Sequence, residues 1–194
     1  MISLLKFSLV ASFLTAICHI TALAMSGIDP IATPVRDLSQ QEFGSIQTLG
    51  LVLFGSAHLA LAVATEGLDY GRLWPYGRSL LAASGLVLFW VAFTFLTGDP
   101  ATTDHNDPLW LVATLIGVAM GAFQPGLARL SSGLGLFCAL CLGVWLILIP
   151  LILLVNDSWL GAYERLVGAV YLVWVAGVTL GLLQLREIEQ SAES

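Results

Sequence analysis

The stretch "SWLGAYERLVGAVYLVWVAGVTLGLL", residues 158–183, decides the fold, because no charged residue follows Arg165 within it. A helix needs about 20 mainly apolar residues to cross the roughly 30 Å hydrocarbon core of a membrane. In lipid every backbone N–H and C=O group must be paired within the protein, so an apolar run of this length spans the membrane as a helix.

The composition of the chain indicates that lipid is its main solvent. Of its 194 residues, 58% are hydrophobic and 10% are charged, with a mean hydropathy of +0.91. Soluble domains carry roughly 25% charged residues, so this chain could not cover a surface that faces water. The net charge of −6 excludes the basic patch that a nucleic-acid partner requires. Its three cysteines lie in apolar runs and predict no disulfide framework.

Five further apolar segments resemble the one just quoted. We therefore predict an all-α, integral membrane bundle of six transmembrane helices that forms a single domain over residues 1–194. The expected helices are residues 4–25, 45–66, 78–97, 108–128, 133–155 and 163–185. Between the second and third helices, "RLWPYGR" (residues 72–78) is typical of an aromatic and basic anchor at the membrane interface.

Positive residues in the loops predict the orientation. With the N-terminus inside, five of the seven Lys and Arg residues lie on the cytoplasmic side, and only Arg36 and Arg165 lie outside. The five are Lys6, Arg72, Arg78, Arg129 and Arg186. This bias favours an N-in/C-in membrane protein, in contact with membrane lipids.

The first apolar segment has two interpretations. "ALAM" at residues 22–25 offers a small-residue cleavage site after a positive start at Lys6, as in a secretory signal peptide. The apolar run exceeds the 7–15 residues typical of a signal core, so we expect a retained helix.

Two helices carry small-xxx-small faces, which let neighbouring helices approach closely in lipid. These are Gly117 and Gly121 in the fourth helix, and Gly177 and Gly181 in the sixth. We expect these faces to seat neighbouring helices of the same chain. The alternative is a homo-oligomer or a contact with other subunits of a membrane complex.

Four charged residues are expected to form a cluster at the outer end of the bundle. Arg36 and Asp37 precede the second helix, and Glu164 and Arg165 begin the sixth. The helix dipole favours Glu164 at this position but disfavours Arg165. Arg165 is therefore expected to turn inward to a carboxylate, with Asp37 or Asp107 as the preferred partner.

An enzymatic alternative rests on the loop "GDPATTDHNDP", residues 98–108. Asp104, His105 and Asp107 are candidate catalytic residues, because paired carboxylates with a histidine can activate water, directly or through a metal. The same residues also fit a solvated loop that ends in a helix cap at Asp107 followed by Pro108. We favour the cap, and predict no metal site.

Two histidines lie inside predicted spans, where ionisable residues are often functional. His19 and His58 could serve as axial ligands of a haem. Their depths differ by about 10 Å, counted at 1.5 Å per residue, which is large for one iron. We favour interhelical hydrogen bonds for both, and predict no cofactor.

Three elements carry a resemblance to a known family. They are "RDLS" with Asp37, "DHNDPLWL" with Asp104 and Asp107, and "WLGAYER" with Trp159, Gly161, Glu164 and Arg165. With these, nearly the whole chain resembles the prokaryotic membrane family called domain of unknown function 998. Many relatives carry a histidine where this chain has Trp110. The resemblance implies six membrane helices and no established activity.

The expected function follows from what the chain visibly provides. We predict a non-enzymatic membrane protein, either a structural subunit or a binder of a lipid or small apolar ligand, with the charge cluster at its outer mouth. A membrane hydrolase or transferase using the outer Asp, His and Glu residues is the first alternative. A haem-binding or transport component is the second.

Overall fold

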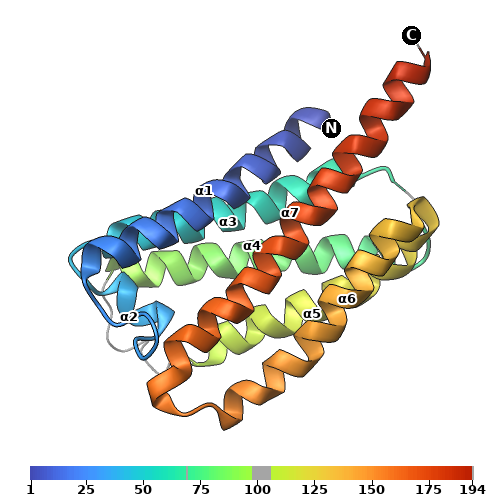
Figure 1. Ribbon diagram of the computed structural model, residues 1–194. Coiled ribbons are helices and arrows are strands. Elements are labelled where there is room, and N and C mark those ends of the chain that lie inside the picture. The colour runs from blue at the N-terminus through green and yellow to red at the C-terminus, as the bar shows by residue number, and fades with distance from the viewer. Residues whose placement is uncertain (69, 98–105, 194) are drawn as a thin grey trace.

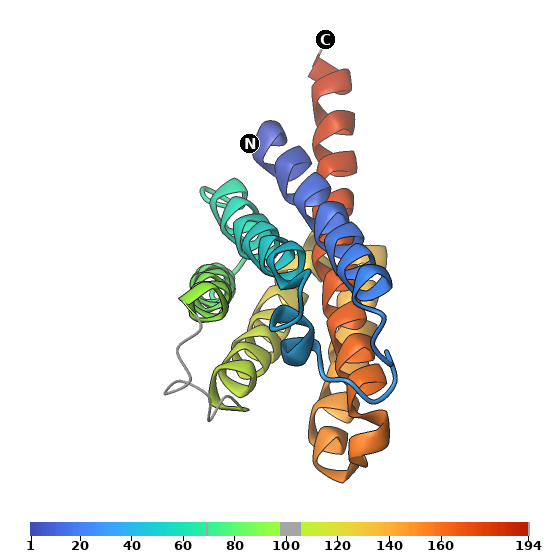
Figure 2. The same cartoon turned by 90° about the vertical axis from the view of Figure 1, so that its left-hand side faces the viewer.

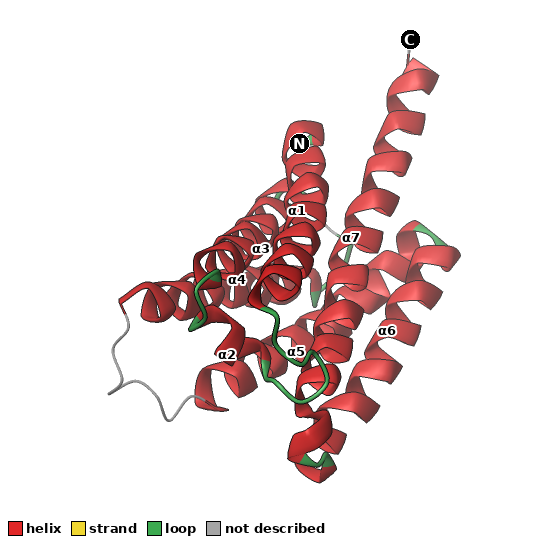
Figure 3. Cartoon of the chain, turned by 60° about the vertical axis from the view of Figure 1, so that its left-hand side comes forward, coloured by secondary structure: helices red, strands yellow, loops and turns green. Residues whose placement is uncertain are grey.

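The computed structural model describes residues 1–68, 70–97 and 106–193, without the side chains of residues 36, 106–110, 189, 192 and 193. Every regular element in these ranges is a helix (Figures 1 and 3). Six of the helices are long and apolar enough to cross a membrane, which confirms the predicted number of spans. A short helix, α2 (Val35–Ser39), was not predicted and lies between the first two spans.

The long helices run close to the predicted ranges. They are α1 (Ile2–Ser26), α3 (Gly44–Ala64), α4 (Trp74–Thr97), α5 (Asn106–Leu130), α6 (Ser132–Leu151) and α7 (Leu160–Glu193). Two 3₁₀ turns, Ile152–Leu154 and Asp157–Trp159, connect α6 to α7. The helix α6 ends at Leu151, one residue after Pro150.

Each span packs against the next one along the chain, from α1 and α3 through α4 and α5 to α6 (Figure 2). The last helix, α7, contacts both α6 and α1 and so joins the two ends of this series. Both termini lie at the same end of the bundle, which we call the terminal end (Figure 1). The other end, where α7 begins beside the α1–α2 loop, is called the clamp end.

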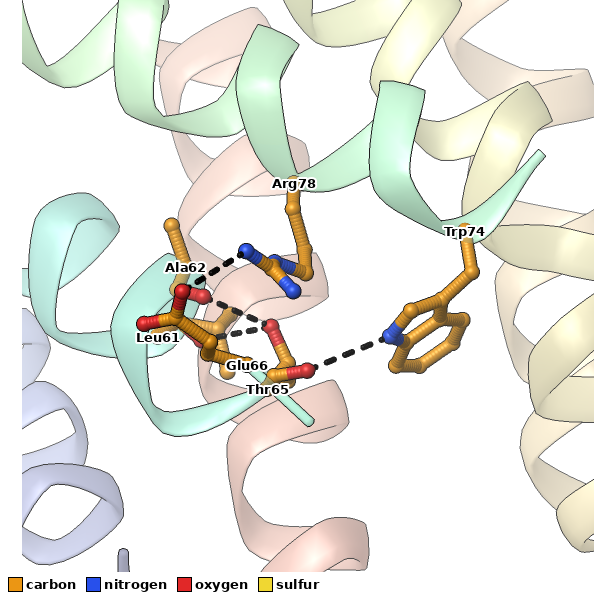
Figure 4. A network of polar contacts seen from close by, with 6 residues as sticks. All are labelled: Leu61, Ala62, Thr65, Glu66, Trp74 and Arg78. Atoms are coloured by element: carbon orange, nitrogen blue, oxygen red, sulfur yellow. Dashed lines mark hydrogen bonds and ion pairs between the residues drawn. The ribbon is translucent and has the colours of Figure 1, made fainter. Parts of the chain in front are cut away.

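The connection between α3 and α4 differs from the prediction. The helix α4 begins at Trp74, and the side chain of Trp74 is 1% exposed, so it is a core residue and not an interfacial anchor. Its Nε1 donates to the carbonyl of Thr65 over 3.4 Å (Figure 4). Beside it, Arg78 Nη2 lies 3.7 Å from Glu66 Oε1. These contacts fix the turn between the two helices.

Aromatic side chains from four helices fill the interior. Trp74 packs edge-on against Phe123 with ring centroids 4.7 Å apart, and Phe123 lies 6.1 Å from Trp174. Trp174 in turn stacks with Tyr171 at 6.3 Å, and Trp145 lies 5.8 Å from Tyr171. Large rings of this kind bury much area at low cost in conformational entropy, which suits the interior of a bundle.

Both glycine faces are covered by α6, which lies between α5 and α7. A methyl group added at Gly117 would lie 3.0 Å from Trp145 Nε1 of α6. On α7, a methyl group at Gly177 would overlap with the ring of Phe137, and one at Gly181 with Leu134. The glycines thus seat helices of the same chain, as we favoured.

The helix α7 is longer than predicted and projects beyond the other helices at the terminal end (Figures 1 and 2). Near this end Lys6 Nζ lies 3.7 Å from Glu187 Oε1, with both side chains more than half exposed. Such an exposed pair contributes little to stability.

Candidate functional site

The start of α7 holds the loop between α1 and α2 through backbone groups. Glu164 Oε2 accepts a 2.6 Å hydrogen bond from the N–H of Val35. Arg165 Nη1 donates to the carbonyls of Pro30 and Thr33, at 2.6 and 2.9 Å. We call this set of contacts the clamp. It connects segments more than 125 residues apart in the chain, since 129 positions separate Val35 from Glu164.

Gly161 allows the loop to come this close. A Cβ atom at this position would overlap with the backbone carbonyl of Thr33, so the approach requires a residue without a side chain. One residue further, the N–H of Ala162 donates to the carbonyl of Ile31 over 2.9 Å. The element "WLGAYER" therefore acts as a docking platform for the loop.

In the described part of the chain, Glu164 and Arg165 of the predicted charge cluster bond to backbone groups. The hydrogen bonds of Arg165 go to backbone carbonyls, and not to the carboxylate of Asp37 that we expected. Asp37 lies in the first turn of α2, and the side chains of Arg36 and Asp107 lie outside the described part of the chain. The carbonyls of Pro30 and Thr33 can take the place of a carboxylate as partners of Arg165, because a guanidinium group donates in several directions.

One edge of the Arg165 guanidinium remains unused. Its Nε and Nη2 atoms are buried and have no hydrogen-bond partner in the protein. These two N–H groups form the side edge of the guanidinium, which matches the two oxygens of a carboxylate or phosphate. The clamp thus fixes Nη1 and leaves a bidentate donor edge.

His19 lies at the same end of the bundle and also keeps one nitrogen unpartnered. Its Nδ1 bonds to Oε1 of Gln47 over 2.8 Å, and the Gln47 side chain is only 4% exposed. The amide oxygen can only accept, so Nδ1 carries the proton and Nε2 of the neutral ring is an acceptor. Nε2 is buried without a hydrogen-bond partner in the protein.

His58 has a different environment, in the middle of the bundle. Its Nδ1 bonds to the carbonyl of Phe54 at 2.5 Å, and its Nε2 bonds to the hydroxyl of Tyr171 on α7. The side chain is fully buried. Both ring nitrogens are engaged within the protein, and the bond to Tyr171 is the kind of interhelical hydrogen bond that we favoured for His58.

The candidate residues of the enzymatic alternative lie largely outside the described part of the chain. Asp104 and His105 lie outside the described residues, and only the backbone of Asp107 is described, in the first turn of α5. Within the described ranges, no group of three His, Cys, Asp or Glu side chains is placed to hold a metal ion.

Comparison with known proteins identifies the family. The model of the family described as "Protein of unknown function (DUF998)" matches residues 9–181. The chain belongs to the DUF998 family. No curated protein and no solved structure matches this DUF998 protein.

The region that matches the family includes the whole clamp of this DUF998 protein, since the α1–α2 loop and Arg165 both lie between residues 9 and 181.

Sequence reasoning missed two residues, Gln47 and Tyr171. Gln47 stands one turn into an apolar helix, a position where a polar amide is a usable signal. Tyr171 is surrounded by apolar neighbours in the sequence, and only the fold shows its partner.

Proposed function

We propose that this protein is a non-enzymatic, multi-pass protein of the prokaryotic inner membrane that binds the anionic group of an amphiphile through Arg165. Its termini lie in the cytoplasm, and the clamp end faces outward, as the distribution of Lys and Arg predicts. The observation that carries the proposal is the buried edge of Arg165, whose Nε and Nη2 have no partner in the protein.

Energetics favour an external partner for this edge. A buried donor without a hydrogen bond costs about 1–3 kcal/mol, and more when the group is charged. An anionic oxygen pair would satisfy both N–H groups at once and offset the charge. Binding requires the loop over residues 27–34 to give way, since both nitrogen atoms are closed off from solvent in the structure.

The surroundings of Arg165 favour an amphiphile over a free ion. Leu166, the next residue on α7, is 51% exposed, and Trp159 just before the helix is 61% exposed. On α1, Ile20 stands next to His19 and is 63% exposed. These apolar side chains face lipid in a membrane protein, so a ligand that binds Arg165 with its head group can lay its acyl chain against them.

Native mass spectrometry of the full-length protein tests the proposal. We expect the wild type to retain phosphatidylglycerol in preference to phosphatidylcholine. In Arg165→Gln, and to a lesser degree in Arg165→Lys, retention should fall roughly ten-fold or more, as expected for charge-assisted hydrogen bonds of 1.5–3 kcal/mol. Lysine keeps the charge but cannot offer the bidentate edge.

The matched control is Arg129→Gln. Arg129 also donates through Nη1 to a backbone carbonyl, that of Tyr70 at 3.3 Å, but it is exposed and lies at the terminal end. It should retain phosphatidylglycerol like the wild type. Equal retention of phosphatidylglycerol by the Arg165 and Arg129 variants would contradict the proposal. Water would then be the partner of Nε and Nη2 of Arg165.

A further inference from the structure

We infer that the ligand of the Arg165 site carries a hydroxyl group next to its anionic oxygens, and that this hydroxyl donates to Nε2 of His19. The inference rests on the proposed function, because it assumes that an anion occupies the Arg165 edge. It adds the second half of the head group and so narrows the class of ligand to hydroxylated acidic amphiphiles, such as glycerol phosphodiesters.

The first step is the tautomer of His19. Gln47 is 4% exposed, and its Oε1 accepts the proton on Nδ1 over 2.8 Å. The buried amide therefore holds the ring in one tautomer, with the lone pair on Nε2. That lone pair has no partner in the protein, although the atom is buried.

The second step is the complementarity between the two residues. Arg165 offers two donors without partners, and His19 offers one acceptor without a partner. A phosphate or carboxylate alone satisfies the donors but brings no proton to Nε2 when it is ionised. A ligand with an anion and an adjacent hydroxyl satisfies all three atoms, because a hydroxyl is both a donor and an acceptor.

The third step is the way the fold brings these residues together. His19 belongs to α1, Gln47 to α3 and Arg165 to α7, and α1 packs against both other helices. The unpartnered atoms of His19 and Arg165 are therefore carried by helices that pack against each other at the clamp end. A head group bound between α1 and α7 at this end would meet the donors of one helix and the acceptor of the other.

Two lipids with the same charge distinguish the contribution of the hydroxyl to binding from that of the anionic group. Phosphatidylglycerol and phosphatidylethanol are both phosphodiesters with one negative charge, but only the first has hydroxyls on its head group. We expect the wild-type protein, in competition experiments read by native mass spectrometry, to prefer phosphatidylglycerol roughly five-fold, the ratio that one net hydrogen bond provides.

Soluble glycerol phosphate, added in the same assay, tests whether the site binds a free head group or only a membrane lipid. Its binding at equal concentration would assign the site to a soluble ligand and overturn the amphiphile part of the inference.

Two variants of Gln47 test the role of the tautomer. Gln47→Glu places a carboxylate against Nδ1, which favours the doubly protonated ring and turns Nε2 into a donor, so the preference should be lost. Gln47→Leu removes the oxygen that accepts from Nδ1, frees the ring to exchange tautomers, and should reduce the ratio toward one. His19→Phe, which removes the acceptor itself, should abolish the preference while binding of both lipids still depends on Arg165.

The outcomes distinguish the two proposals. If both lipids bind equally well to the wild type and both are lost in Arg165→Gln, the anion site stands and the inference about the hydroxyl is wrong. If phosphatidylglycerol is retained irrespective of Arg165, the proposed function itself fails. A preference that survives in His19→Phe, in protein that melts like the wild type, also overturns the inference.

Discussion

The hydroxyl of Tyr171 on α7 donates its hydrogen bond to Nε2 of His58 on α3, across 113 positions of sequence. The direction follows from the other ring nitrogen, because Nδ1 faces the carbonyl of Phe54, which can only accept. Ser84 Oγ of α4 lies 3.4 Å from the same hydroxyl. Three helices therefore meet at one polar point inside an aromatic interior, and this point specifies how they are oriented about one another.

Replacing Tyr171 with Phe should destabilise the protein by about 1–3 kcal/mol, because Nε2 of His58 is left buried without a partner. The measurement is the unfolding free energy in detergent or lipid micelles. Tyr76→Phe is the control, since Tyr76 is 66% exposed. Adding His58→Leu to Tyr171→Phe should recover part of the loss, because both polar partners are then gone. No recovery would mean that packing, and not the hydrogen bond, matters at this point.

Exchanging the charges of the clamp should not restore stability. Glu164 bonds to an N–H and Arg165 bonds to carbonyls, so each side chain faces a backbone group of fixed polarity. Glu164→Arg combined with Arg165→Glu places like partial charges against each other at both contacts. We expect the double variant to melt no higher than either single variant, with faster protease cleavage in residues 27–34. Recovery to the wild-type melting temperature would show that the two residues act as an ion pair.

Two glycines of α7 provide a matched pair for helix packing. A methyl group at Gly177 would overlap with the Phe137 ring, whereas one at Gly168 meets nothing within 4 Å. We expect Gly177→Ala to cost about 1–3 kcal/mol in unfolding free energy, as overpacking typically does. Gly168→Ala should stay within about 0.5 kcal/mol of the wild type, as substitutions away from tight contacts do. Equal effects would contradict the tight α6–α7 contact.

The first helix should be retained in the protein isolated from membranes. The side chains of Ser8 and Ala22 on α1 are fully buried, and Ser8 Oγ donates to the carbonyl of Ala57 over 2.9 Å. Cleavage after "ALA" would remove this packing from α3 and α7. The intact mass of the purified protein should therefore include residues 1–24. A mass that lacks them would show that the segment is a signal peptide.

The orientation can be tested with reporter fusions. The bias of Lys and Arg places both termini in the cytoplasm, and the structure puts them at the same end of the bundle (Figure 1). A cytoplasmic reporter fused after Ser194 should be active, and one inserted after Gly27 should be inactive. The reverse pattern would invert the membrane orientation and place the clamp in the cytoplasm.

The sequence by itself determined the fold class and the six spans. Lipid does not hydrogen-bond to the backbone, so each apolar run of about 20 residues has only the helix available to it. The helix boundaries differ in part from the prediction, because α4 begins at Trp74, before the expected start at residue 78, and α5 ends at Leu130, past the expected end at residue 128. Pro75 fits this start of α4, since a proline in the first turn of a helix costs no hydrogen bond, and α5 contains Pro125 within its length.

The tertiary structure alone decided which polar groups meet. Arg165 was expected to find a carboxylate, but its partners are the carbonyls of Pro30 and Thr33, which no side-chain pattern records. His58 and Tyr171 likewise meet only because α7 lies across α3. Whether a segment forms a membrane helix depends on its own apolar residues and on the lipid around it, so the sequence of that segment is enough to predict it. Partners from distant segments depend on how the helices pack, and this becomes visible only when the whole chain is folded.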